Sequence, residues 1–387
     1  MPCTRREFGK LTLAGLPAAA LLGRAESVFG AVAQPKPNSF IDGVQIGTIT
    51  YSYRSMPDQS AEATLKYIVD SGISAIELMG GPVESFAGAP ASGRGAGPGG
   101  PGGPGGPGGR GRGGERGAPP PIPEGAQKGS WNGQECVISA PAGAAGAPGG
   151  GGRGRGREMS AEQQAAQQEQ AARLKAWRTS VSMDPFRKLR QMYDDAGVTI
   201  YAWKQLNPNM SDEEFEYVFN VAEALGCTHT TLELPADEAQ LERIGDFAMK
   251  KKIYAAYHTH TQGSMTAFDR AFALSKGNMA NVDLGHYVAA GNVGGTPIQF
   301  LEKHHDRIAS FHLKDRTTPA HCALNLPWGT GETPIREILQ LVKKNKWKMP
   351  ATIEFEYETP GGSDAVKEVR TCLEYCRRAL GSAATAA

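Results

Sequence analysis

The feature that most constrains the fold is a strict alternation of short apolar segments with longer amphipathic ones. Runs of apolar, β-branched and aromatic residues are typical of buried strands, and an apolar face that repeats every three to four residues is typical of helices. The predicted strands cover residues 45–53, 73–80, 198–205, 229–235, 253–260, 279–287, 308–315 and 349–358. The predicted helices between and after them cover residues 61–72, 184–197, 211–226, 236–252, 267–277, 296–307, 333–347 and 363–380.

This alternation predicts a parallel sheet, because each strand must return to the same edge through a helical crossover. Eight such units favour closure into a (β/α)8 TIM barrel, and we therefore predict one α/β domain over residues 41–387. An open, doubly wound sheet is the alternative. It is disfavoured because the glycine fingerprint that binds a dinucleotide is missing after the first predicted strand.

One segment, residues 86–157, interrupts the pattern after the second predicted strand. It holds many of the 50 Gly and 26 Pro residues and few apolar side chains that could be buried, so we predict a disordered, low-complexity insertion. Because the insertion follows a strand, it should emerge on the face where barrel active sites lie. A tolerated loop and a lid over the site are the two interpretations, and the composition favours the first. Residues 160–177, rich in Ala, Gln and Glu, predict a helix that leads back to the barrel.

The N-terminus has the pattern of an export signal. Arg5 and Arg6 precede an apolar run at residues 11–22, and small residues at 31–33 could form a cleavage site. The paired arginines resemble a twin-arginine signal, which exports folded proteins. We therefore expect residues 1–33 to be removed and the mature protein to be periplasmic, with no membrane attachment because the apolar run is too short to span a bilayer.

The charge and the cysteines narrow the partners. Lys and Arg total 41 against 40 Asp and Glu, so no net field favours nucleic acid or a membrane surface. Six cysteines include one in the signal, which leaves an odd number without a CxxC pair. Cys372 and Cys376 share a helix face, and we interpret them as packed thiols rather than as part of a disulfide framework or zinc knuckle. We expect a small-molecule partner, and a homo-oligomer is compatible with the sequence.

Chemically active side chains cluster at the ends of the later strands. The carboxyl ends of parallel barrel strands meet at one rim, which is where such barrels place their active sites. Five consecutive predicted strands end in metal-ligand or proton-transfer residues: Glu233, then His258 and His260, Asp283 and His286, His312 and Lys314, and Glu354 and Glu356. One such residue alone would be an ordinary surface group, but five strand ends in succession predict a site. Carboxylates with a neutral imidazole suit Mn²⁺, which we expect, or Co²⁺, Mg²⁺ or Zn²⁺.

Four short motifs carry a resemblance to a known family. DLGH (283–286), HLKD (312–315), PWGTGE (327–332) and IEFEYE (353–358) are similar to motifs of the sugar phosphate isomerase/epimerase family, within the xylose-isomerase-like barrel superfamily. The resemblance covers nearly the whole barrel apart from the insertion. It implies Asp283, His312 and Glu354 as metal ligands. The epimerase branch has a further glutamate on strand five, whereas this chain has YHTH (257–260) there.

That departure leaves the fourth ligand open. We predict Glu233 for the position, with His258 and His260 as rival ligands or as the proton-transfer residue, and Glu354 or Glu356 as its partner. Lys314 is expected to steady a developing oxyanion, unless it only pairs with Asp315. The remaining expected contacts to the substrate are those of His286 and Trp328.

The resemblance implies a metal-dependent enzyme that removes a proton next to a carbonyl through an enediolate. Export suggests a non-phosphorylated sugar or sugar derivative as substrate. The main alternative is a lyase or hydratase that acts on 3-keto-glycosides, because YHTH also resembles the dehydratase branch. A non-catalytic sugar-binding barrel is a third reading. AP endonucleases share the superfamily, but they need more histidines and a basic groove.

Overall fold

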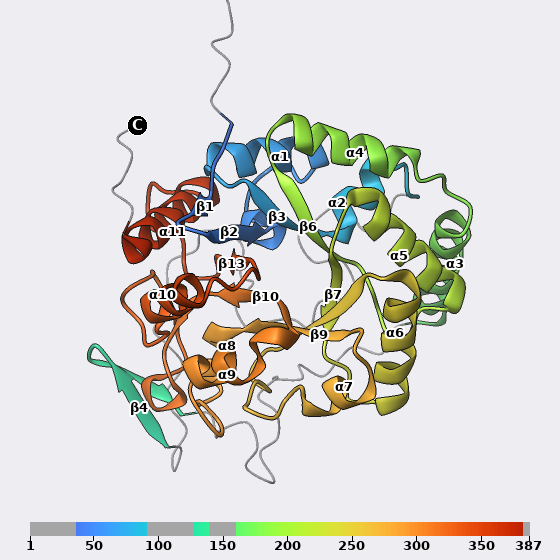
Figure 1. Ribbon diagram of the computed structural model, residues 1–387. Helices are drawn as coiled ribbons and strands as arrows, with labels where there is room; N and C mark the ends of the chain where they lie inside the picture. The colour runs from blue at the N-terminus through green and yellow to red at the C-terminus, as the bar shows by residue number, and fades with distance from the viewer. Residues whose placement is uncertain (1–35, 91–126, 139–159, 382–387) are drawn as a thin grey trace, which may run out of the picture. The chain divides into compact units, whose positions relative to one another are not determined.

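The computed structural model describes residues 36–90, 127–138 and 160–381, and within them eight parallel strands form a closed barrel (Figure 1). The barrel strands are β2 (Val44–Ile49), β3 (Ala75–Met79), β6 (Thr199–Lys204), β7 (His229–Glu233), β8 (Tyr254–His258), β9 (Asn278–Asp283), β10 (Ile308–Leu313) and β13 (Ala351–Ile353). β2 pairs in parallel with both β3 and β13, which closes the sheet. The predicted barrel is therefore confirmed, and an open sheet is excluded. The predicted signal segment lies outside the described residues.

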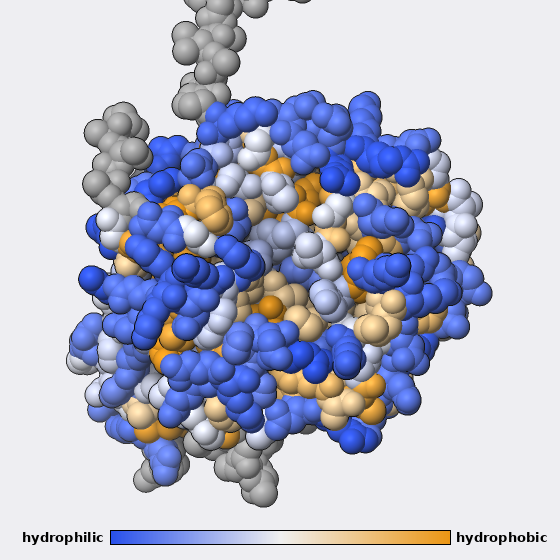
Figure 2. Space-filling view, viewed as in Figure 1, coloured by the Kyte–Doolittle hydropathy of each residue, from blue (hydrophilic) through white to orange (hydrophobic). Residues whose placement is uncertain are grey.

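Helices surround this barrel, as Figure 1 shows. They are α1 (Ala61–Asp70), α2 (Gly80–Phe86), α3 (Ala161–Arg178), α4 (Asp184–Asp195), α5 (Asp212–Leu225), α6 (Glu238–Lys251), α7 (Asp269–Leu274), α8 (Leu284–Ala289), α9 (Pro297–His304), α10 (Ile335–Asn345) and α11 (Ala365–Leu380). Their apolar residues, such as Ile338 and Leu339 of α10, are fully buried against the strands. Hydrophilic residues dominate their outward faces, and paler and apolar residues gather over the centre of the view in Figure 2. No helix in the described part of the chain is long and apolar enough to cross a membrane.

Two predicted strands are shorter in the structure because their ends turn into other backbone. β9 stops at Asp283, whose side chain accepts a hydrogen bond from the backbone N–H of His286 at 2.7 Å and begins the short helix α8. β13 stops at Ile353, so Glu354 and Glu356 follow the strand rather than belong to it. A side chain that caps the next helix thus ends the strand and fixes the position of its last residue.

Part of the insertion is ordered. Residues of β4 (Lys128–Trp131) and β5 (Gln134–Val137) form an antiparallel hairpin, which the composition did not predict. A disulfide between Cys136 and Cys322 ties the hairpin to the segment after β10. The sequence could not pair two cysteines 186 residues apart. Cys372 and Cys376 are buried free thiols, as predicted, and Cys227 is a third.

The two ends of the insertion are joined by a buried ion pair. Arg178, the last residue of α3, donates to both carboxylate oxygens of Glu84 on α2, at 2.8 and 3.1 Å. Glu214 and the hydroxyl of Tyr217, both on α5, complete the group at 3.2 and 3.0 Å. The predicted helix at 160–177 is confirmed as α3. Because Glu84 and Arg178 hold its entry and exit together, the barrel can accommodate the long insertion.

Candidate metal centre

Four buried side chains converge at the carboxyl ends of four neighbouring strands. His258 ends β8, Asp283 ends β9, His312 lies near the end of β10, and Glu354 follows β13. One possible ligand atom from each lies within 4.8 Å of the other three. All four are nearly inaccessible, with relative exposures of 1%, 0%, 0% and 6% in chain order. We call these four residues the ligand group.

Glu233, the predicted fourth ligand, does not fall in this group. It belongs to a second set with His258 and His260, again with possible ligand atoms within 4.8 Å of one another. Glu233 accepts an ion pair from Lys204 at 2.9 Å and faces Nδ1 of His260 at 3.2 Å. The structure therefore places His258, and not Glu233, beside Asp283, His312 and Glu354. The reason is register: Glu233 pairs with His258 across β7 and β8, so the two side chains occupy neighbouring strands at one level.

His312 is held between two carboxylates. Its Nε2 lies 2.8 Å from Oε2 of Glu77, and its Nδ1 lies 2.6 Å from Oε2 of Glu354. Burial alone would lower the pKa of His312, but the two carboxylates outweigh it and raise that pKa to about 10. Without a metal, His312 is therefore an imidazolium that donates to both neighbours.

Lys314 does not pair with its neighbour Asp315. Its Nζ lies 2.6 Å from Oε2 of Glu356 and 3.0 Å from both Oδ2 of Asp283 and Oε2 of Glu354. Burial would lower the pKa of Lys314, and the three carboxylates raise it instead. The ammonium thus shares two carboxylates with the ligand group, which places a fixed positive charge beside it.

His258 and His260 have different environments. His258 is buried, and burial together with the positive charge of Lys204 keeps its pKa well below the usual value, so the ring is neutral. The His260 side chain is 36% exposed, and Glu233 raises the pKa of His260 against the effect of burial. Burial in turn would raise the pKa of Glu233, but His260 and Lys204 lower it to about 2. A neutral buried imidazole suits a ligand, whereas the accessible His260–Glu233 pair suits proton transfer.

His286 lies at the rim beside these residues. Its Nδ1 is 2.5 Å from a guanidinium nitrogen of Arg316, and its Nε2 is 3.9 Å from Glu356. The centroid of its ring lies 4.8 Å from that of His260. Burial and the charges of Lys314 and Arg316 lower the pKa of His286 well below its usual value. The predicted substrate residue His286 is thus part of the same polar cluster.

Trp328, the other predicted substrate residue, packs against Tyr375 of α11, with ring centroids 5.8 Å apart. The structure does not bring it into the ligand group. Its loop is organised by Asp315, which accepts backbone N–H groups from Gly329, Gly331 and two neighbouring threonines at 2.7 to 3.2 Å. The Asp of HLKD therefore shapes the PWGTGE loop.

Glu77 is a site residue that sequence reasoning missed. It lies on β3, is completely buried, and bonds to His312 at 2.8 Å and Thr231 at 2.6 Å. Sequence reasoning followed the strand ends, whereas Glu77 is in the middle of the apolar strand AIELM. A lone carboxylate inside such a strand was the available signal, since a buried charge requires partners.

The donor set fits a divalent cation. Nδ1 of His258 and Oδ2 of Asp283 are buried without a hydrogen-bond partner among the described residues. Such atoms are costly unless something else satisfies them. Around them, the carboxylates of the cluster outnumber its lysines, Lys204 and Lys314: Glu77, Glu233, Asp283, Glu354 and Glu356. Two imidazoles and two carboxylates with additional negative charge nearby are suited to a borderline-hard metal ion.

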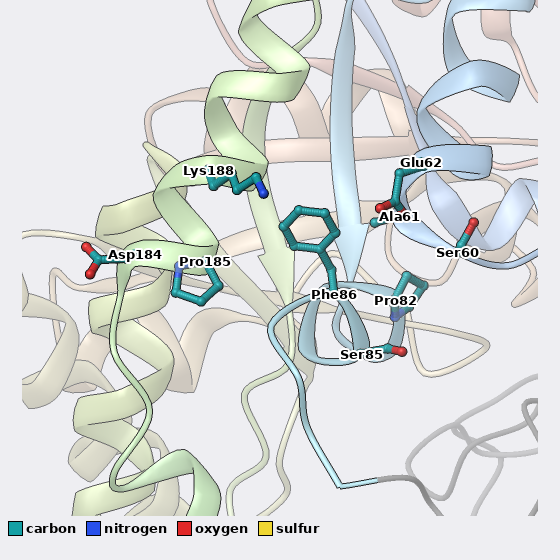
Figure 3. Close-up of a pocket in the computed structure, with 9 residues that line it drawn as sticks. All are labelled: Ser60, Ala61, Glu62, Pro82, Ser85, Phe86, Asp184, Pro185 and Lys188. Atoms are coloured by element: carbon teal, nitrogen blue, oxygen red, sulfur yellow. The ribbon is translucent and has the colours of Figure 1, made fainter. Parts of the chain in front are cut away.

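A separate groove of about 780 Å³ lies between α1, α2 and α4. Figure 3 shows Phe86 and Pro82 of α2 facing Lys188 and Pro185 of α4 across this hollow. It shares no lining residue with the polar cluster, and nothing in its lining resembles a metal or proton-transfer site. The chemistry therefore belongs to the barrel mouth and not to this groove.

The fold and site define an α/β barrel with a polar centre at the carboxyl ends of its strands. Residues 165–378, over half of the chain, match the family described as Xylose isomerase-like TIM barrel. The chain belongs to this family. None of the curated proteins compared with the chain matches it.

Solved structures share the fold at low identity. The probable 3-DHS dehydratase AsbF from Bacillus anthracis is 10% identical, with a TM-score of 0.50 over 86% of this chain and 98% of that one. A xylose isomerase domain protein from Alicyclobacillus acidocaldarius is 12% identical, with a TM-score of 0.49 over 87% and 98%. A sugar phosphate isomerase/epimerase from Parabacteroides distasonis is 14% identical, with a TM-score of 0.48 over 91% and 96%.

Proposed function

We propose that this chain is a divalent-metal-dependent enzyme that removes a proton next to a carbonyl in a non-phosphorylated sugar or sugar derivative. The observation that carries the proposal is the convergence of His258, Asp283, His312 and Glu354 at the barrel mouth. These four residues would hold the cation, with His258 in the position predicted for Glu233. When bound, a divalent cation, Mn²⁺ in our expectation, stabilises the negative charge that develops on the substrate oxygen.

The accessible His260 is the proposed base. Of the two candidate histidines, His258 is 1% exposed and lies in the ligand group, whereas the His260 side chain is 36% exposed. Glu233 lies against its Nδ1, which orients the ring and leaves Nε2 to accept the substrate proton. Glu356, held by Lys314 at 2.6 Å, is the proposed partner that returns a proton from the other side of the site. Lys314 steadies the charge of the deprotonated substrate.

The cations of the rim favour a substrate without phosphate. Lys204 and Lys314 already contact carboxylates, and Arg316 contacts His286 and the carbonyl of Ala323. The Gly-Gly-Ser turn at residues 361–363, a conceivable phosphate cradle, instead precedes α11: Ser363 donates to Glu368, and Asp364 caps the helix. A phosphate would have to displace one of these existing contacts.

Elimination on a 3-keto-glycoside is the second candidate. It is favoured by the two histidines at the end of β8, in the place where the epimerase branch has a glutamate base. One base that removes the proton, with a leaving group β to the carbonyl, is sufficient for elimination. Epimerisation instead needs a proton donor on the opposite face, for which Glu356 is the residue available in the described part of the site.

Metal analysis of the purified protein, followed by assays on 3-keto-glucosides and on free ketoses with and without a chelator, tests the proposal. Exchange of the proton next to the carbonyl with deuterium from the solvent should require metal and His260. Loss of the glycosidic substituent would identify a lyase, and exchange with retention of the substituent would identify an isomerase or epimerase. Sugar binding without exchange or turnover would support a binding barrel and refute an enzymatic role.

We also propose that the enzyme works in the periplasm, as its N-terminal pattern predicts. The disulfide between Cys136 and Cys322 supports an oxidising compartment. Fusion of residues 1–33 to a reporter that is active only after twin-arginine export would test the signal. Replacement of Arg5 and Arg6 by lysines should retain the reporter in the cytoplasm.

A further inference from the structure

The contact between Glu77 and His312 suggests a role for a residue outside the ligand group. Both side chains are completely buried, and Oε2 of Glu77 is 2.8 Å from Nε2 of His312. The two residues lie on β3 and β10, which are not adjacent in the barrel sheet, so the contact crosses the barrel interior. Burial would raise the pKa of Glu77, but His312 and Lys204 lower it, so Glu77 is a carboxylate that accepts a proton from His312.

The carboxylate is itself fixed in place. Thr231 donates to its Oε1 at 2.6 Å, and Nδ2 of Asn281 lies 3.4 and 3.3 Å from its two oxygens. Asn281 accepts in turn from Ser310 at 2.9 Å, which anchors this amide from a third strand. Glu77 is therefore held on several sides and cannot follow a rotation of the imidazole ring.

A fixed acceptor at Nε2 decides which nitrogen of His312 faces the ligand group. A histidine that binds a metal through one nitrogen commonly donates its other N–H to a carboxylate, which sets both tautomer and ring orientation. Here the proton is kept on Nε2, and Nδ1 is directed at Glu354, 2.6 Å away. The nearest other candidate, Nδ2 of Asn281, lies 3.4 Å from Nε2 and is a donor, so it cannot fill this role.

We propose that Glu77 is a positioning residue that keeps the Nε2 proton of His312 and directs Nδ1 into the ligand group. The inference rests on the proposed function, because it gives Nδ1 the task of ligation. Glu77 contacts neither the substrate nor the cation. Its effect is exerted through His312.

The test compares Glu77→Gln with Glu368→Gln. The amide has no charge and only one acceptor oxygen to share between His312 and Thr231, so it holds the ring less firmly. Glu368 is also buried and accepts from the hydroxyl of Tyr357 at 2.6 Å, which makes E368Q a matched change outside the polar cluster. Titration calorimetry with Mn²⁺ should show an affinity about 10–100-fold lower for E77Q and unchanged for E368Q.

Nuclear magnetic resonance of ¹⁵N-histidine-labelled protein gives a second readout that does not depend on activity. The Nε2–H proton of His312 should resonate far downfield in the wild-type and E368Q proteins, and it should shift upfield or vanish in E77Q. An E77Q protein with unchanged Mn²⁺ affinity and an unchanged Nε2–H signal would overturn the proposal.

Two outcomes separate the inference from the proposed function. If the wild-type protein binds no divalent cation, the proposed metal centre fails, and the Nε2–H signal alone then decides whether Glu77 positions His312. If E77Q does not fold, Thr231→Val removes only the hydroxyl that anchors Glu77. The same Nε2–H signal should then broaden or shift, and a signal identical to that of the wild type would refute the positioning role.

Discussion

Lys314 lies against Asp283, with its Nζ 3.0 Å from Oδ2, and both side chains are buried. Asp283 also belongs to the ligand group, and its Oδ2 has no hydrogen bond within the described residues. The ammonium therefore neutralises part of the negative charge that would attract a metal ion. Lys314 and a bound cation would share the same carboxylates, so their effects on stability are coupled.

Replacement of this ammonium should make the protein more dependent on metal. We expect Lys314→Met to destabilise the metal-free protein by about 3–5 kcal/mol, because it leaves buried carboxylates uncompensated. Added Mn²⁺ should raise the melting temperature of the variant by more than that of the wild type. Lys343→Met, which removes a half-exposed partner of Asp42, is the control. An equal metal-induced shift in K314M and wild type would contradict the coupling.

Ligand and base should separate by mutation. His258→Gln and Asp283→Asn should each weaken Mn²⁺ binding by more than the ~10–100-fold that loss of a residue behind a ligand costs. Glu233→Gln and His260→Asn should leave the metal content close to that of the wild type and reduce solvent deuterium exchange. Elemental analysis and the exchange assay on the same preparations check both statements. Loss of metal in E233Q with retention in H258Q would restore Glu233 as the ligand.

The charge of His312 predicts a pH dependence of the metal-free protein. Its pKa is raised to about 10 in the folded state, against about 6.5 in an unfolded chain. The stabilisation is therefore fully present below pH ~6.5 and is lost as the pH rises through about 10. Urea unfolding of chelator-treated protein should show a decline in unfolding free energy over this range. The decline should be smaller in His312→Gln, and identical slopes in the two proteins would refute the assignment.

Removal of the disulfide should free the hairpin without unfolding the barrel. The Cys136–Cys322 bond joins the β4–β5 hairpin to the segment after β10, and neither hairpin strand belongs to the barrel sheet. We expect the double variant Cys136→Ser/Cys322→Ser to keep the thermal midpoint within a few degrees. Limited proteolysis should cut it faster near residues 127–138. Reduction of the wild type should have the same effect, since Cys227, Cys372 and Cys376 are buried thiols.

The buried pair that joins the ends of the insertion should be important for stability. Loss of one partner of such a pair leaves a buried charge without compensation, so Arg178→Met should cost about 3–5 kcal/mol in urea unfolding. The additional change Glu84→Met should recover part of this loss. Arg187→Ala, which removes an exposed contact to Asp184, serves as the control and should have no measurable effect. A double variant as unstable as the sum of the single ones would show that the two residues are independent.

Much of the site was predictable because strand ends in a parallel barrel are brought to one rim by topology alone. Asp283, His312 and Glu354 were found this way, and the structure places them together. The choice between Glu233 and His258 was not predictable, because it depends on the register of β7 against β8 and on which side chain each strand turns inward. Glu77 was missed because its function depends on a contact across the barrel.

The sequence by itself determined the barrel, since eight alternating strands and helices leave few other ways to bury their apolar faces. It also determined which residue types stand at the strand ends. Only the tertiary structure decided which of them meet, because contacts such as Glu77 with His312 and Cys136 with Cys322 join segments 235 and 186 residues apart. No local pattern encodes such pairs. They follow from strand register, side-chain direction and the packing of the closed sheet.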